Sequence, residues 1–293
     1  MAGVRSEVWT GEMIRQCTHE ETFLAGVPDY SRLSENEAIH LVQVGARPGV
    51  VSNNTSYPIP TNVRADIDVP IGLDKYQTEV TIVSDDDLYA LSYDIISSVL
   101  QDHREVLQEG TADKAIHAFA PVSNAPDTPI LLSTGGDDGF GRKRLTVADI
   151  IRAKRQCDDL KWPKRGRRLV LCNEHIEDIL MENEAFKQQY QNIPEGKVLK
   201  LYGFEIHEYA ANPVYNASNT KKAFGAATAG TDRNSSVFFL VGRMFKAMGS
   251  TKFYYDLAAN NPRMQQNEMN YRLYFIAQPK NAEAHGAIVS DRV

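Results

Sequence analysis

The sequence predicts an α+β fold, in which strands and helices occupy separate stretches of the chain. Apolar and polar residues alternate from Ile67 to Leu73, as in a strand that buries one face. At Ser84 the hydrophobic period changes from two to about 3.6, which predicts a long helix joined to a strand without a loop. The last third carries three strand-like segments, SSVFFLV, RMFKAMG and NYRLYFIAQ. Segregated strands and helices of this kind are typical of an α+β protein.

The first 36 residues are predicted to form an N-terminal arm. One short amphipathic helix is expected there, around Val8, Trp9, Met13 and Ile14. The segment has too few apolar residues to fold by itself, because a short isolated helix is only marginally stable in water. We therefore expect residues 1–36 to dock elsewhere and to add little to the core of their own chain.

Residues 37–83 are predicted to form two strands around a long tip rich in Gly, Pro, Asn and Ser. The tip is too long for a simple hairpin loop, so the segment should project. One face of the second strand carries Ile67, Val69, Ile71 and Leu73. The same alternation is expected to resume through Tyr76, Thr78, Val80 and Ile82. The segment therefore reads as a half-exposed ribbon.

The long helix is expected to begin at Ser84, whose hydroxyl is a good N-cap. Asp85, Asp86 and Asp87 follow, and their charges suit the positive end of a helix dipole. The helix is predicted to end near Glu109, before Gly110. Its apolar residues lie on two neighbouring stripes, more than one buried face requires, so packing from two sides is expected.

The remaining elements follow from local signals. A capping box from Thr146 to Asp149 predicts a second helix. A short buried strand is expected at Arg167–Cys172, then a helix over Glu174–Met181. Two further strands, KVLKL and FEIHEY, should be joined by a turn at Tyr202 and Gly203. The polar stretch Ala258–Asn270 is interpreted as a loop.

The composition limits the classes of protein that are compatible with this chain. With 293 residues, 42% hydrophobic and 24% charged, it is globular and able to bury one large core or two modest ones. There is no signal-peptide h-region and no apolar run of about 18 residues, which predicts cytosol-like surroundings and no membrane partner. Cys17, Cys157 and Cys172 are odd in number and widely spaced, so we interpret them as reduced and structural. The net charge of −6 argues against a surface that is basic throughout and binds nucleic acid.

Two motifs are ambiguous. The loop Gly136–Gly141, followed by Arg142 and Lys143, imitates a phosphate-binding loop, but its lysine is one place late and two aspartates would repel phosphate. We interpret it as a solvated turn, with nucleotide binding as the alternative. The cluster Lys161–Arg168 holds five cations in eight residues. It is interpreted as a solvated loop, with contact to nucleic acid or to another subunit's acids as the alternatives.

No catalytic constellation is found. The seven histidines include none at ligand spacing, and neither HExxH nor GxSxG occurs. The acids gather at helix starts, where capping explains them. We expect no catalytic residue, no metal and no cofactor, and hence no enzyme.

The order of elements resembles the major capsid proteins of tailed bacteriophages, which have the Hong Kong 97-type fold. The resemblance rests on the arm, the long loop, LDKYQTEVTIVSDDDLYALSYDIISSVLQDH, LTVADIIRAKRQCDDLKWP, RRLVLC and KVLKLYGFEIHEY, and covers essentially the whole chain. It implies five regions: an N-terminal arm (1–36), an extended loop (37–83), a peripheral domain with the long spine helix (84–159), an axial domain (160–250), and strands that return to the peripheral domain (251–293). The strand Tyr271–Gln278 should return beside the spine.

The resemblance implies a coat protein that self-assembles into an icosahedral shell around double-stranded DNA. Its partners would be copies of itself in hexamers and pentamers, portal and scaffolding proteins, a cement protein, and packaged DNA contacted without sequence specificity. The protein would be found in the virion after assembly in the host cytoplasm. The residues expected between subunits are Trp9, Arg47, Arg64, Ile67, Val69, Ile71, Asp85, Asp86 and Asp87.

Two alternatives stay open: an encapsulin-like compartment with the same fold around a cargo enzyme, and an enzyme of nucleotide chemistry that uses the Gly136 loop. The type member of the fold cross-links its shell through a lysine of the extended loop. Here the first lysine is Lys75, at the base of that loop, and arginine cannot replace it as a nucleophile. A shell of this chain is therefore expected to lack that cross-link.

Overall fold

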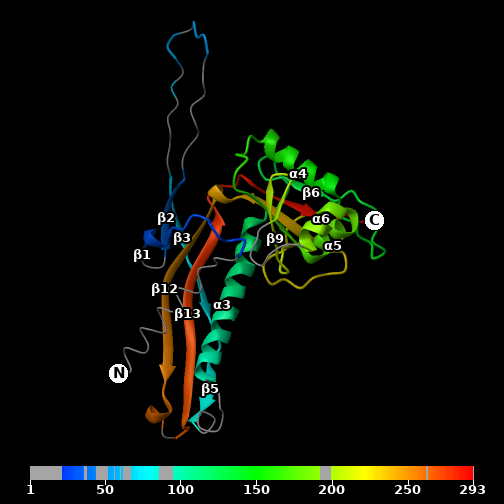
Figure 1. Cartoon of the computed structure of the whole chain (residues 1–293). Coiled ribbons are helices and arrows are strands. Elements are labelled where there is room, and N and C mark those ends of the chain that lie inside the picture. Colours follow the sequence, from blue (N-terminus) through cyan, green and yellow to red (C-terminus); the bar gives the residue numbers. More distant parts are fainter. Residues whose placement is uncertain are drawn as a thin grey trace.

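The structure is a computed structural model that describes residues 22–35, 38–43, 52–55, 57–59, 61, 67–85, 95–191, 199–261 and 263–292. It is a mixed α+β fold, as predicted. A long sheet with one long helix along it extends to one side, and a wider sheet with three helices lies at its end (Figure 1). No helix in the described part of the chain is long and apolar enough to cross a membrane.

The long sheet is built around two long antiparallel strands. Its members are β12 (Met244–Asp256), β13 (Gln266–Pro279), β4 (Asp74–Gln77) and β5 (Thr81–Ser84). Strand β13 lies in the middle, with β12 on one side and β4 and β5 following one another on the other. Two short 3-10 turns, η2 (Val241–Arg243) and η3 (Ala258–Asn260), flank β12. Strand β13 contains Tyr271–Gln278 and lies beside the long helix (Figure 1), as the resemblance implied.

The long helix α3 spans Ile95–Phe119 and does not end at Gly110. A glycine inside a helix costs about 1 kcal/mol relative to alanine, which is why Gly110 reads as a stop. Here burial outweighs that cost, because Ala112, Ile116 and Phe119 are all buried in the main core beyond the glycine. The predicted start at Ser84–Asp87 lies largely outside the described residues.

The second sheet has the order β6-β14-β11-β7-β9-β8, with β10 also paired to β11. Its strands are β6 (Ile130–Leu132), β7 (Arg167–Leu171), β8 (Leu199–Leu201), β9 (Phe204–Glu208), β10 (Val214–Tyr215), β11 (Arg233–Leu240) and β14 (His285–Val289). Helices α4 (Val147–Asp159), α5 (Asn173–Glu182) and α6 (Glu184–Gln191) complete this part of the molecule (Figure 1). The pairs β14–β6 and β7–β9 are parallel, and the other pairs are antiparallel.

Several local predictions are confirmed in this sheet. Thr146 caps α4, its side chain accepting from the backbone N–H of Asp149, and the reciprocal half of the capping box is also present. Strands β8 and β9 meet at Tyr202 and Gly203, both of which have positive φ angles, 48° and 88°. Positive φ at both central residues is the geometry of a tight hairpin turn. At Gly286 the constraint is space, because a Cβ there would collide with the ring of Phe238.

The second sheet draws elements from distant parts of the chain. Helix α4 and strand β6, from the segment 84–159, belong with the second sheet: Ile150, Ala153 and Cys157 pack into its core. Strand β14, from the segment 251–293, also joins that sheet, between β6 and β11. The two sheets share one core cluster, in which Phe119 of α3 lies 4.9 Å from Phe239 of β11 between ring centroids.

A third, small sheet has the order β1-β2-β3. It comprises β1 (Ser34–Glu35), β2 (Ala38–Gln43) and β3 (Ile67–Gly72), preceded by the turn η1 (Ser31–Leu33). Pairing of β2 with β3 confirms the predicted two-stranded ribbon, with Ile39 opposite Ile71 and Leu41 opposite Val69. The predicted loop Ala258–Asn270 is wrong in its last part, since β13 already begins at Gln266 and buries Asn267 and Met269.

Candidate assembly surfaces

The ribbon of β2 and β3 leads to a tip that lies away from both larger sheets (Figure 1). At its base, the partly buried Ile71 packs against a small core cluster of its own chain, made of Ile39, Phe245, Ala247 and Ile276. Contact with a neighbouring subunit was predicted for this residue, and the structure already gives it a partner within the chain. The side chains of Ile67 and Val69 lie outside the described part, so their contact with a neighbour stays a prediction.

The tip presents apolar side chains to solvent. Among its described residues, Tyr57 is 78% and Ile59 is 55% exposed. A projecting segment with large exposed apolar groups is unsatisfied within one chain and is favourable only when it contacts another surface. The predicted contact residues Arg47 and Arg64 lie outside the described residues, as do Trp9, Asp86 and Asp87.

The segment 22–35 does not behave as a free arm. Phe23, Leu24 and Val27 are buried in the main core, although residues 1–36 were expected to add little to it. The ring of Phe23 lies edge-on to Phe119 and Tyr209, with centroids 6.4 and 5.2 Å apart. That expectation is wrong for residues 22–35, because the turns at 22–27 place Phe23, Leu24 and Val27 in the same core cluster as residues of α3.

Backbone contacts fix the same segment. The Arg168 guanidinium donates from Nη1 to the carbonyl of Phe23 at 2.8 Å and to that of Ala25. Further along, the Tyr30 N–H donates to the carbonyl of Lys246 at 2.8 Å, and the Tyr30 ring stacks on Phe245. Arg168, which was read as part of a solvated basic loop, therefore anchors the N-terminal segment.

The register of β5 differs from the predicted alternation. Val83 is buried, whereas Val80 and Ile82 are 53% and 56% exposed. Between β4 and β5 the chain leaves the ladder at residues 78–80, and this break shifts the alternation by one residue. On α3, Leu100 and Leu107 face the core, and Val106 is 61% exposed. Asp85, which directly follows β5, is half-buried, and its N–H donates to the carbonyl of Gln265.

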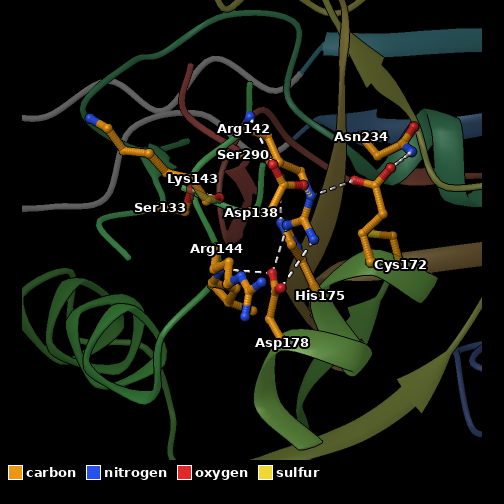
Figure 2. Close-up of polar contacts among 12 residues, drawn as sticks. Ser133, Asp138, Arg142, Lys143, Arg144, Cys172, His175, Asp178, Asn234 and Ser290 are labelled. Carbon is orange, nitrogen blue, oxygen red and sulfur yellow. Dashed lines mark hydrogen bonds and ion pairs between the residues drawn. The ribbon is translucent and has the colours of Figure 1, made fainter. Parts of the chain in front are cut away.

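The loop that imitates a phosphate-binding motif is held by a buried cation, Arg142 (Figure 2). Its guanidinium contacts both oxygens of Asp178 at 2.6 and 3.0 Å, Asp138 at 2.9 Å and Glu174 at 3.6 Å. Burial by itself would raise the pKa of Asp138. The N–H groups of Phe140 and Arg142 and the charge of Arg142 outweigh it and hold that pKa below its ordinary value. The Arg142 guanidinium is thus paired with carboxylates of its own chain and is not available to bind a phosphate.

The same loop carries Phe140, which is 91% exposed. Asp137 and Asp138 each accept a backbone N–H two residues on, which orders the turn beneath the ring. Next to it lies an open cavity of about 440 Å³, whose lining includes the acids Asp138, Glu174, Glu177 and Asp232 together with Arg142 and Arg233. An ordered loop with a bare aromatic ring suits contact with another protein surface better than contact with a nucleotide.

Part of the basic cluster Lys161–Arg168 is structural. Arg167 is buried, donates to the carbonyls of Trp162 and Pro163, and pairs with Asp158 at 2.8 Å. Lys161, Lys164 and Arg165 are exposed. Sequence reasoning could not separate the two kinds, because the spacing of the charges does not reveal which ones point inward.

His175 is the histidine whose surroundings come closest to those of a catalytic base. Its ring nitrogens contact the hydroxyls of Ser236 and Ser290 at 2.6 and 2.8 Å. The side chain is fully buried, and burial lowers its pKa to about 4. The ring is closed off from solvent, and its contacts join α5, β11 and Ser290, which directly follows β14. Cys157 and Cys172 are free and buried, and the described residues contain no cluster of ligands that could hold a metal.

No family model matches this chain, and no curated protein matches it in sequence. Solved structures match it over nearly its whole length. A structure of Mycobacterium phage Che8 matches with a TM-score of 0.63 and 11% identity, covering 91% of this chain and 90% of that one. The capsid of Ralstonia phage GP4 matches with a TM-score of 0.65 and 7% identity, over 94% and 89%.

A virus-like particle from Pyrococcus furiosus also matches, with a TM-score of 0.59 and 10% identity over 97% of this chain and 99% of that one. These likenesses define the class of the fold. The chain has the Hong Kong 97-type fold of capsid proteins.

Proposed function

We propose that this chain is the major capsid protein of a tailed bacteriophage and that its copies assemble into a closed icosahedral shell around double-stranded DNA. The observation that carries the proposal is the match to phage capsid structures over about nine tenths of both chains. A projecting ribbon with an apolar tip and the exposed Phe140 support it, because such surfaces are satisfied when copies overlap.

In this proposal the ribbon of residues 37–83 lies over a neighbouring subunit through Ile67 and Val69. The long sheet with α3 serves as the peripheral domain, and the second sheet as the axial domain that meets its copies in pentamers and hexamers. Arg47 and Arg64 would meet acids such as Asp85–Asp87 of a neighbour. Trp9 would contribute a further contact. The finished protein would reside in the virion after assembly in the host cytoplasm, with portal, scaffolding and cement proteins as partners.

A second candidate is an encapsulin-like compartment that encloses a cargo enzyme. The virus-like particle from Pyrococcus furiosus favours it, because that match covers almost all of both chains. The long ribbon favours the phage capsid protein over the compartment protein. The contents of the particle distinguish the two candidates, since a phage head holds DNA and a compartment holds a folded protein.

Electron microscopy of the purified full-length protein tests the proposal. We expect closed shells, or the pentamers and hexamers from which shells form, across a range of salt and protein concentrations. Discrete monomers at high concentration in every condition, with or without a scaffolding protein, would count against both candidates. Nuclease treatment followed by protein analysis of native particles then separates a DNA-filled shell from a cargo compartment.

A further inference from the structure

The outer face of the long sheet carries charges sorted by sign. On β12, Phe253 and Tyr255 pack toward α3, so Lys252, Tyr254 and Asp256 point to the opposite face. Their partners across the strand pair on β13 are Arg272, Asn270 and Glu268. Along the face there is thus a row of two cations, then a neutral pair, then a row of two acids.

The cationic row is unusual because two like charges face each other. Lys252 lies directly opposite Arg272, an arrangement that destabilises a sheet when nothing compensates it. The Arg272 guanidinium lies 5.6 Å from the ring centroid of Tyr254 and 5.3 Å from that of Tyr274. Among the described residues, neither cation has a carboxylate within ion-pair distance. The two rings therefore hold a guanidinium that has no acidic partner among the described residues.

The acidic row repeats the pattern with opposite sign. Asp256 lies directly opposite Glu268. Asp256 accepts from the Asn260 amide at 3.2 Å, and Glu268 accepts from the Gln266 amide at 2.7 Å. Within the described part of the chain, no Lys or Arg pairs with either acid. Each row therefore carries the charges that would pair with the other row. The two rows cannot meet within one chain, because both lie on the same sheet.

The spacing of the two rows allows a second copy of the chain to pair with both of them at once. Residues 252 and 256 are four positions apart, about 13 Å along a strand, and Tyr254 lies midway. A twofold axis in the plane of the contact, across the strands at Tyr254 and Asn270, places Lys252 over Asp256 of a second copy. The same operation places Arg272 over Glu268 of that copy. Tyr254, 42% exposed, then meets its own counterpart near the axis.

We propose that this face is an isologous contact between two copies of the chain, held by reciprocal Lys252–Asp256 and Arg272–Glu268 pairs. The inference rests on the proposed function in one respect, that copies meet in a shell. Nucleic acid fits the face less well, because the acidic row would repel phosphate. A second copy carries both signs at matching spacing, and complementary charge favours correct pairing and fast association.

A charge swap tests the contact. Lys252→Glu places Glu against Asp256 of the other copy, and Asp256→Lys places Lys against Lys252. Each single variant should raise the protein concentration needed for association by roughly tenfold or more at low salt. The double variant Lys252→Glu/Asp256→Lys restores opposite charges, so its association should return to within about threefold of the wild type. Sedimentation velocity of the full-length protein measures particles and dimers alike.

Two controls keep the result specific. In the single variants the reversed charge faces an opposite charge on the neighbouring strand, so the free energy of unfolding should not fall. Lys164→Glu makes the same charge change on an exposed loop and should leave association unchanged. If the wild type assembles and both single variants assemble equally well, the contact is refuted while the proposed function stands.

Other outcomes are equally decisive. Absence of both particles and dimers in the wild type would overturn this contact, and absence of particles alone would count only against the proposed function. If Lys252→Glu weakens binding of a duplex DNA probe, Asp256→Lys strengthens it and the double variant restores nothing, the face binds a polyanion instead of a second copy.

Discussion

Arg142 and Asp178 form a buried two-point ion pair, with Nη1 2.6 Å from Oδ2 and Nη2 3.0 Å from Oδ1 (Figure 2). The pair joins the loop before α4 to helix α5, 36 residues further along the chain. Asp178 also accepts the N–H of Leu145 at 2.8 Å. One carboxylate thus fixes both ends of the segment 142–145.

Arg142→Ala should therefore destabilise the fold strongly. Removal of one partner leaves Asp178 buried and unpaired, which costs about 3–5 kcal/mol in comparable cases. Urea unfolding monitored by circular dichroism measures the change. Arg155→Ala serves as the control, since Arg155 is exposed and its pair with Asp159 is long, 3.8 Å. That control should cost less than about 1 kcal/mol. Equal effects for both variants would show that the buried pair is unimportant.

Stability should fall as the pH is lowered from about 6.5 to 4. The pKa of His175 lies near 4 in the folded chain, because burial disfavours its charged form, against an ordinary value of 6.5. In this window the unfolded chain binds a proton that the folded chain does not, so stability rises with pH. The contribution is on the order of 3 kcal/mol, fully present above pH 6.5.

His175→Gln keeps a donor and an acceptor for Ser236 and Ser290 without a titrating ring. Its free energy of unfolding should depend less on pH between 4 and 6.5 than that of the wild type. The difference isolates His175 from the other histidines whose pKa values burial lowers, such as His207 and His285. His40→Gln, at an exposed position of β2, makes the same replacement away from the buried site and serves as the comparison variant. An identical slope in His175→Gln would refute the assignment.

Phe23→Ala should destabilise the single chain by about 3–5 kcal/mol, since it removes a buried aromatic ring from the main core. Deletion of residues 1–21 leaves the described contacts of Phe23, Leu24 and Val27 in place, so the subunit should still fold. Thermal unfolding compares the two. A deletion of residues 1–36 that unfolds at the wild-type temperature would show that the segment 22–35 is dispensable.

Val69→Asp and Ile71→Asp should separate assembly from folding. Ile71 packs against the core cluster that contains Phe245 and Ile276, so a charge there should lower the stability of the single chain by several kcal/mol. Val69, two residues nearer the tip, is proposed to face a neighbour, and Val69→Asp should abolish shells while the subunit stays folded. Electron microscopy and urea unfolding of both variants provide the readouts. Normal shells from Val69→Asp would mean that this position faces solvent.

Local chemistry predicted those elements whose signals are local. The capping box at Thr146 and the turn at Tyr202 and Gly203 depend on neighbouring residues alone, and both are confirmed. The predictions at Gly110, as a helix end, and at Gln266, as part of a loop, were wrong. At both places burial against parts of the chain that are distant in sequence outweighs the local conformational preference. The predicted alternation failed at Val80, because no residue pattern in the sequence signals the break between β4 and β5 in their pairing with β13.

The contacts that fix the candidate surfaces could not be predicted in the same way. Arg142 meets Asp178, and Arg168 meets Phe23, across 36 and 145 residues. A run of cations in the sequence does not reveal which one folds inward. For the same reason Lys252 and Arg272 looked unrelated until strand pairing placed them side by side.

Strand β14 lies between β6 and β11, and this position sets the order in which the molecule can be completed during synthesis. Every other strand of the second sheet leaves the ribosome earlier. Until Val289 has been translated, β6 lacks its only neighbour in that sheet among the described strands, and one edge of β11 stays open. The second sheet is therefore completed only after the long strands β12 and β13, which lie between β11 and β14 in the sequence, have been synthesised.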